Sequence, residues 1–188
     1  HFCFHRHNVE RLSALPDWAQ ETLKEHVRDP RSEIYSWEEL ARGRTGDEVW
    51  DAAQASLLKH GELHNNIRMT WGKALLNWTA SPQKALSMLI DLNHRFALDG
   101  RDPASYGGIL WCFGQFDRPF QPERPVHGLV RGRTTAEHRK RLDIEAYRLE
   151  RAQPNWRQRY RVAVIGAGMS GMAAARTLTD QVVEVEVF

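Results

Sequence analysis

The chain has 188 residues, of which 41% are hydrophobic and 27% are charged, and its formal net charge is +2. This composition suits a globular protein with a sizeable core, and no apolar run approaches the ~18 residues that a membrane span requires. Two cysteines, Cys3 and Cys112, exclude a disulfide framework, and with the scattered histidines they match no zinc-ligand spacing. We therefore expect a soluble, intracellular (cytoplasmic) monomer with free thiols, no bound metal and no membrane contact.

The first part of the chain is predicted to be helical. Residues 1–16 are aromatic and apolar without a capping residue, as if a helix had been entered part-way, so we expect the chain to be a piece of a longer protein, cut at both ends. Helices are predicted over 17–27, from Ser36 with Glu39 as a capping box, and from Thr45 or Asp47 to Gly61.

The stretch 61–79, GELHNNIRMTWGKALLNWT, is predicted to form a helix with two distinct faces. Helical spacing puts Ile67, Trp71, Leu75 and Trp78 on a core-facing stripe. A neighbouring face carries polar residues and is a candidate for ligand binding; it consists of Asn65, Arg68, Met69 and Gly72. On the pattern alone, a half-exposed helix with Asn and Arg in solvent is the simpler interpretation.

Helix signals continue to residue 153. Ser81 and Pro82 begin a helix that is predicted to end near residue 97, a glycine-rich structured loop follows at 98–108, and a short apolar helix at 109–117 carries Trp111. An extended proline-rich loop precedes a last polar helix over 133–153. From Arg118 to Arg161 there are twelve Lys or Arg against five Asp or Glu, which suits a polyanionic partner, although solvated helix faces also carry such runs.

The pattern changes at residue 161. The β run RVAVI, a glycine-rich turn, the helical stretch MAAARTLT and a second β run VVEVEVF predict a βαβ unit. Gly166, Gly168 and Gly171 fit G-x-G-x-x-G, in which the turn lets a pyrophosphate approach a helix N-terminus. We therefore expect a linker at 154–160 and the start of a Rossmann domain at 161–188, which would bind a second FAD or NAD(P).

Four motifs in order and spacing carry a family resemblance: WDAAQ, GELHNNIRMTWGKALLNW, LNHRFALDGRDP and DRPFQPERPVHGLVR. They resemble the FAD-binding helical domain of class II cyclobutane pyrimidine dimer photolyases, in the photolyase/cryptochrome superfamily, over roughly residues 1–150. Residues 160–188 resemble the opening of a flavin amine oxidase-like oxidoreductase. The resemblance implies a mainly α, photolyase-type helical domain over 1–153, incomplete at its N-terminus, followed by an incomplete Rossmann-like βαβ fragment.

The resemblance also implies residue roles. Arg68 and Asp99 match a buried pair beside the flavin ring, Asn93 matches the residue facing flavin N5, and Asn65 and Asp102 complete the FAD-binding set. Met69 and Trp111 match contacts to the pyrimidine dimer, while electrons reach the flavin through Trp50, Trp71 and Trp78. Contacts to damaged DNA are expected from Asp117, Arg118, Phe120, Arg124 and Arg131, with Phe120 standing where the family usually has Trp.

The implied activity is light-driven repair of pyrimidine dimers in DNA by electron transfer from reduced FAD. A cation beside the flavin stabilises its negative charge, and tryptophans can carry charge to the surface. One alternative is a cryptochrome-like photoreceptor, which would keep the tryptophans but need not keep Met69, Trp111 and Arg118. Others are an accessory domain of an amine oxidase-like enzyme and a helical scaffold with no activity of its own.

Overall fold

The computed structural model describes residues 2–152, 161–179 and 184–188. The chain divides into two compact units, His1–Gln153 and Pro154–Phe188. The linker predicted at 154–160 lies outside the described residues.

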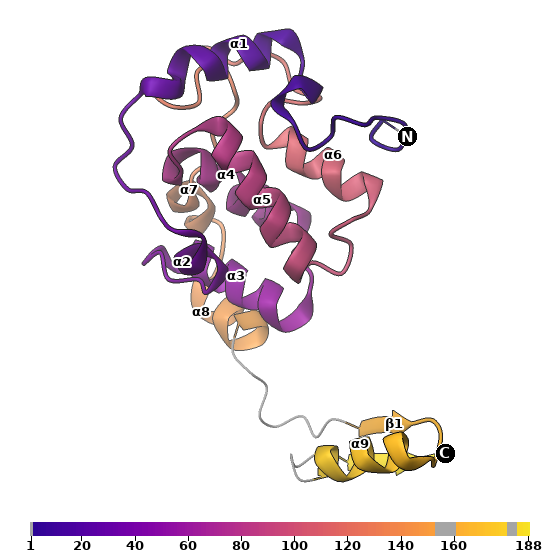
Figure 1. The fold of residues 1–188 in the computed structure, drawn as a ribbon. Coiled ribbons are helices and arrows are strands. Elements are labelled where there is room, and N and C mark those ends of the chain that lie inside the picture. The colour runs from indigo at the N-terminus through magenta and orange to yellow at the C-terminus, as the bar shows by residue number, and fades with distance from the viewer. Residues whose placement is uncertain (1, 153–160, 180–183) are drawn as a thin grey trace. The chain divides into compact units, whose positions relative to one another are not determined.

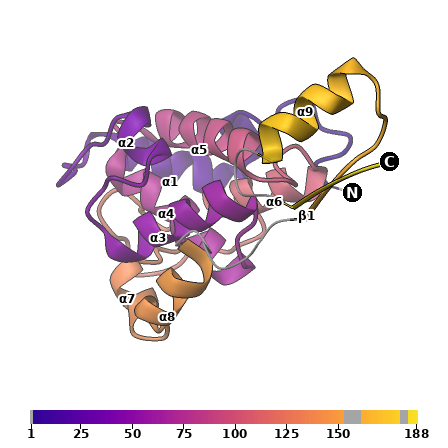
Figure 2. The same cartoon turned by 90° about the horizontal axis from the view of Figure 1, so that it is seen from below.

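The first unit is built from helices and connecting loops (Figure 1). Its helices are η1 (Leu12–Ala14), α1 (Asp17–Glu25), η2 (His26–Arg28), α2 (Trp37–Ala41), α3 (Glu48–His60), α4 (Asn65–Trp78), α5 (Pro82–Phe96), α6 (Pro103–Trp111), α7 (Thr135–Arg139), α8 (Ile144–Tyr147) and the π-helix η3 (Arg148–Ala152). Helix α4 packs against α3, α5, α6 and α7, so it forms the centre of the unit. Seen from below, α7 and α8 lie together beside α3 (Figure 2).

Most predicted helix starts are confirmed by their caps. Ser36 and Glu39 form the reciprocal capping box of α2, and the Ser81 hydroxyl accepts a hydrogen bond from the Lys84 amide at the start of α5. Asp47, rather than Thr45, caps α3 by accepting from the amides of Val49 and Trp50. These local side-chain contacts explain why the sequence alone placed three helix starts.

Other boundaries were predicted wrongly. The central helix begins at Asn65, after His64 caps it, and not at Gly61. A loop was expected at 98–108, but helix α6 begins within it at Pro103 and contains two glycines. The helix ends at Trp111, whereas the predicted apolar helix ended at residue 117. Glycine lowers helix propensity by only ~1 kcal/mol, which packing against α4 and α5 can offset.

Both ends of the helical unit also differ from the expectation. Residues 2–11 form turns and bends before η1, so no helix is entered part-way there. The single helix predicted over 133–153 is divided into α7, α8 and η3. Thr134 and Asp143 each cap a helix, the first through a capping box with Glu137 and the second by accepting from the Ala146 amide. Two N-caps nine residues apart start two short helices instead of one long one.

The predicted core stripe of α4 is confirmed, since Ile67, Trp71 and Leu75 are each 3% exposed or less. Trp78, at the end of the stripe, is half-buried and packs against the same core. Within the described residues, no helix combines the length and the apolar character needed to cross a membrane.

The second unit contains β1 (Arg161–Val164), α9 (Met169–Thr179) and β2 (Glu184–Val187). The two strands pair in parallel, with Val162 opposite Val185. The strand, helix, strand order matches the expectation, but α9 starts at Met169, three residues earlier than the predicted helical stretch. Part of the second predicted strand, residues 180–183, lies outside the described residues.

Candidate functional site

A cavity of about 110 Å³ lies where α4, α5 and α6 meet, and we call it the central cavity. Its lining residues are Arg68, Met69, Trp71, Gly72, Leu89, Asn93, Asp99, Ala104, Ser105, Gly108, Ile109 and Cys112. Three of the four residues on the predicted ligand face of α4 are among them. Met69 is only 9% exposed and Gly72 is buried, so this part of the face points into the protein, whereas Asn65 is exposed as the simpler interpretation expected.

A bidentate ion pair stands at this cavity. Arg68 Nη1 lies 2.7 Å from Asp99 Oδ2, and Arg68 Nη2 lies 3.0 Å from Asp99 Oδ1. These hydrogen bonds from Arg68 hold the pKa of Asp99 below its usual range, although partial burial opposes them. A guanidinium held at both nitrogens has a fixed position, so the pair offers an oriented cation.

Two other predicted cofactor residues lie apart from this pocket. Asn65 is exposed and lines a neighbouring hollow of about 410 Å³ together with Arg68 and Asp99. Asp102 is exposed at the residue before α6 and is not among the residues that line either hollow. Arg68 and Asp99 line both hollows, so Asn65 lies next to the central cavity, whereas Asp102 does not.

Asn93 is 2% exposed, and its amide orientation is fixed by hydrogen bonds. Nδ2 donates to the carbonyl of Gly100 at 2.9 Å and to the Ser105 hydroxyl at 2.8 Å. With both amide protons engaged, the acceptor Oδ1 is the end that is left for a ligand of the central cavity. Ser105 was not recognised from the sequence, because one serine inside an expected loop carries no distinguishing pattern.

The predicted tryptophans form one continuous chain. Trp71 lines the central cavity, its ring stacks on Trp50 with centroids 6.0 Å apart, and Trp50 meets Trp78 edge to face at 5.6 Å. The indole of Trp50 donates to the Trp71 carbonyl, and the indole of Trp71 donates to Gln54 Oε1. The order from the cavity outward is Trp71, Trp50, Trp78, and half-buried Trp78 then meets the Tyr35 ring at 5.3 Å. Gln54 was missed as a site residue, although a glutamine within a core stripe is a signal.

Met69 and Trp111 do not line the same cavity. Trp111 is 41% exposed, its indole donates to Asp117 Oδ1 at 3.0 Å, and it lines a separate hollow of about 350 Å³ with Phe2 and Phe116. This aromatic hollow and the central cavity share Ala104 and Gly108 of α6. The two predicted lesion contacts thus belong to neighbouring hollows.

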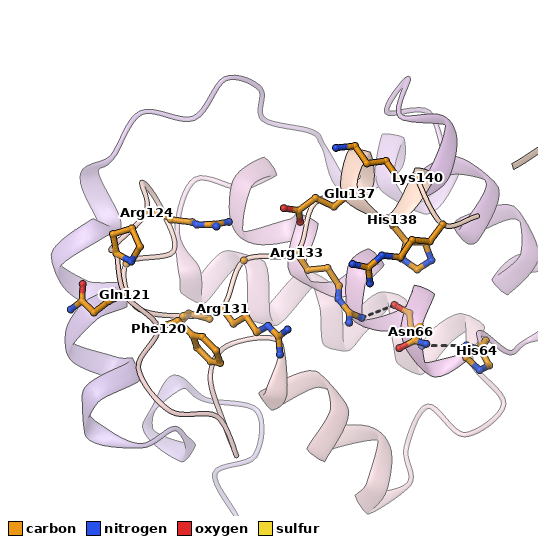
Figure 3. Close-up of a pocket in the computed structure, with 15 residues that line it drawn as sticks. His64, Asn66, Phe120, Gln121, Arg124, Arg131, Arg133, Glu137, His138 and Lys140 are labelled. Carbon is orange, nitrogen blue, oxygen red and sulfur yellow. Dashed lines mark hydrogen bonds between the residues drawn. The ribbon is translucent and has the colours of Figure 1, made fainter. Parts of the chain in front are cut away.

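A larger cavity of about 750 Å³ is strongly basic, and we call it the basic cavity (Figure 3). Its charged or titratable lining residues are His64, Arg124, Arg131, Arg133, Glu137, His138, Lys140 and Arg141. The one acid, Glu137, is engaged at the Thr134 cap. Phe120 also lines this cavity, and the guanidinium carbons of Arg118 and Arg131 lie 5.9 and 5.3 Å from its ring centroid. Three predicted DNA contacts (Phe120, Arg124 and Arg131) are therefore brought together with Arg118 beside them, whereas Asp117 is bound to the Trp111 indole.

Side chains of α1, of η2 and of Asp29 just after η2 hold the loop that carries these residues. Asp29 accepts from the Val126 amide at 2.8 Å, and Thr22 accepts from the Leu129 amide at 3.0 Å. His26 lies 2.6 Å from the Asp29 carboxylate. Gly128 has φ +53°, and a side chain there would collide with Thr22. The loop is thus anchored by a small polar cluster that the sequence did not reveal, because its members lie about a hundred residues apart.

Among the described residues, no three His, Cys, Asp or Glu side chains gather as a metal site would require.

No protein-family model matches the chain. The chain is 39% identical over 147 residues to a deoxyribodipyrimidine photo-lyase of Oryza sativa subsp. japonica, and 40% identical over 146 residues to those of Methanothermobacter thermautotrophicus and Potorous tridactylus. Each match covers 78% of this chain but only 29%, 33% and 27% of the respective relative. The similarity supports the photolyase resemblance, and the chain spans about a third or less of the length of these curated relatives.

The anchoring cluster predicts a pH-dependent stability. The hydrogen bond to Asp29 raises the pKa of His26 above 6.5, against the opposing effect of burial. A raised pKa in the folded state means that this stabilisation is complete below pH 6.5 and is lost as the pH rises through the raised value. The free energy of unfolding of the 188-residue chain should therefore exceed that of His26→Ala by more at pH 5.5 than at pH 8.5. Urea titrations at both values measure this, with exposed His7→Ala as control; a constant difference would contradict the assignment.

Proposed function

We propose that this chain is part of the FAD-binding helical domain of a class II cyclobutane pyrimidine dimer photolyase, which repairs DNA in light. The observation that carries the proposal is the joining of an oriented cation, a fixed amide and the first of three contiguous tryptophans at one cavity. The similarity to curated deoxyribodipyrimidine photo-lyases supports it. Since the chain spans a third or less of those relatives, the activity is proposed for the complete gene product.

The side-chain chemistry around the central cavity suits one edge of a reduced flavin, although the cavity of about 110 Å³ is smaller than the ring system. FAD, when bound, supplies the electron that splits the dimer. Arg68 offers a positive charge held in place by Asp99, which stabilises negative charge on a ligand in the cavity. Asn93 keeps its Oδ1 for a ring N–H, because its Nδ2 is committed to Gly100 and Ser105. Asn65 would contribute from the adjoining hollow.

Trp71, Trp50 and Trp78 would return electrons to the flavin from the protein surface. Ring contacts at 6.0 and 5.6 Å make each step short, and the indole hydrogen bonds of Trp50 and Trp71 keep the rings in place. This chain of rings would also serve a photoreceptor that does not repair. Trp111, placed beside the central cavity and half-exposed, favours repair, because a dimer in the aromatic hollow would stack next to the flavin.

Damaged DNA is the partner that the basic cavity fits best. Arg124 and Arg131 would contact backbone phosphates, with Arg118 and Phe120 at the edge where a flipped dimer leaves the duplex. Backbone contacts of this kind bring affinity for any duplex. Preference for the lesion would then come from Met69 and Trp111.

We propose separately that residues 161–188 begin a Rossmann-type FAD or NAD(P) domain. Its support is the parallel pairing of β1 with β2 and the Gly166–Gly171 turn at the N-terminus of α9. A side chain at Gly171 would collide with the Gly166 carbonyl, so the turn needs a glycine there. This unit would add an oxidoreductase module to the repair domain.

Replacing Trp71 with Phe in the complete gene product tests the main proposal. Photoreduction of oxidised FAD should be nearly lost, since phenylalanine is not oxidised by excited flavin. Enzyme reduced beforehand with dithionite should split dimers within about twofold of the wild-type rate, a change of ~0.4 kcal/mol in activation free energy. Dimer splitting under near-ultraviolet light measures both arms. A wild-type protein that does not split dimers would refute the function, and loss of repair in pre-reduced Trp71→Phe would refute the relay.

The basic cavity predicts a salt signature. The double change Arg124→Ala and Arg131→Ala should weaken binding to damaged and undamaged duplex by similar factors. It should also lower the slope of log K against log salt by about one per arginine. Fluorescence anisotropy across a salt series measures this, with Arg95→Ala on α5 as the control. An unchanged slope would mean that DNA does not enter this cavity.

The second unit predicts a second nucleotide. Gly168→Val in the complete gene product should remove one of two bound nucleotides per chain, because a side chain there would enter the pyrophosphate path. The nucleotide released from denatured protein is counted by absorbance and chromatography. Equal counts for wild type and variant would show that the turn only connects a strand to a helix.

A further inference from the structure

Lys73 is a buried lysine on α4 that lines neither the central cavity nor the basic cavity. It is 3% exposed, although lysine is among the residues least often fully buried. Its Nζ donates to three main-chain carbonyls: Arg131 at 2.8 Å, Cys112 at 3.3 Å and Trp111 at 3.5 Å. An ammonium has three protons, and here all three find an acceptor.

Carbonyl dipoles are the hydrogen-bonding partners of this charge, and the Asp117 carboxylate attracts it from beyond ion-pair distance. In the described part of the chain, no ion pair involves Lys73. Burial is the main cause that lowers the pKa of Lys73. Two of its acceptors belong to the last residue of α6 and its C-cap, where the helix dipole presents partial negative charge. The neighbouring His127 has a pKa lowered to about 4, chiefly by burial, so it stays neutral beside the lysine.

The three carbonyls belong to the segments that carry the proposed lesion and phosphate contacts. Trp111 lies at the end of α6 with its ring in the aromatic hollow, and Arg131 reaches into the basic cavity. Lys73 itself is four residues after Met69 on the helix that also presents Arg68 and Trp71 to the central cavity. The Lys73 ammonium thus links α4 to the main chain at Trp111 and at Arg131, which lie 38 and 58 residues away in sequence.

We propose that Lys73 is a positioning residue for lesion recognition. It sets the distance between α4 and the main chain at Trp111 and Arg131, so that a dimer stacked on Trp111 lies against Met69 while the neighbouring phosphate meets Arg131. Lys73 contacts neither DNA nor flavin in this role. The proposal rests on the proposed photolyase function.

The test is Lys73→Met in the complete gene product, because methionine nearly fills the same volume but donates no hydrogen bond. Binding to dimer-containing and to undamaged duplex is measured by anisotropy, together with FAD content and the rate of flavin photoreduction. Preference for damaged DNA should fall by about tenfold or more, which corresponds to ~1.4 kcal/mol. FAD content and photoreduction should stay at wild-type values, since the side chains of Arg68, Asn93, Trp50, Trp71 and Trp78 make no hydrogen bond to Lys73. Exposed Lys84→Met on α5 is the matched control and should change none of these quantities.

Three other outcomes would overturn the proposal, and each is distinguishable from the others. Unchanged damage preference in Lys73→Met would remove the positioning role while leaving the photolyase function intact. Parallel loss of FAD, photoreduction and damage preference would make Lys73 a general folding residue. If Lys73→Met yields no folded protein, Lys73→Gln is measured by the same criteria, because its shorter neutral side chain reaches fewer carbonyls. A wild-type protein without damage preference would remove the proposed function itself.

Discussion

The close approach of three helices at Gly72 is the constraint on which the helical unit depends. A Cβ at this position would lie 2.7 Å from Cys112 Sγ and 3.3 Å from a Leu89 methyl. Helix α4 can therefore lie against α5 and the end of α6 only because residue 72 has no side chain. The same approach brings Arg68, Asn93 and Ser105 to one cavity. It also puts the Lys73 ammonium within hydrogen-bonding distance of the Trp111 and Cys112 carbonyls at the end of α6.

Buried polar contacts give this packing its specificity. Gln54 is fully buried, donates to the Ala41 carbonyl and accepts from the Trp71 indole. The Trp50 indole donates to the Trp71 carbonyl. Two large rings that could slide in an apolar core are thus fixed relative to α2 and α4, and an unpaired buried donor would cost ~1–3 kcal/mol. Hydrogen bonds thus add to apolar packing in fixing the geometry of the tryptophan chain.

The sequence predicted those features that depend on neighbouring residues. Ser36, Asp47 and Ser81 could be recognised as caps because their partners lie two or three positions away, and the stripe of Ile67, Trp71 and Leu75 follows from helical period alone. The Arg68 and Asp99 pair came from the family resemblance, since 31 residues separate its members. Helix α6 was placed too late in the chain because Gly107 and Gly108 lower its helix propensity, while its packing against α4 and α5 is not visible in the local sequence. Lys73 and Asp29 were missed because nothing local distinguishes a lysine or aspartate that binds distant main chain.

The anchoring of the 118–132 loop has a consequence for the order of folding. Its bonds to Asp29 and Thr22 join residues 97 and 107 positions apart, whereas the caps and the α3 to α5 contacts are much more local. Contacts of large sequence separation carry a high loop-closure entropy and form late. The loop also opens locally at lower free energy than the core, because its anchors are few and partly exposed. The contacts around the central cavity can therefore form before, and independently of, those that anchor the loop of the basic cavity.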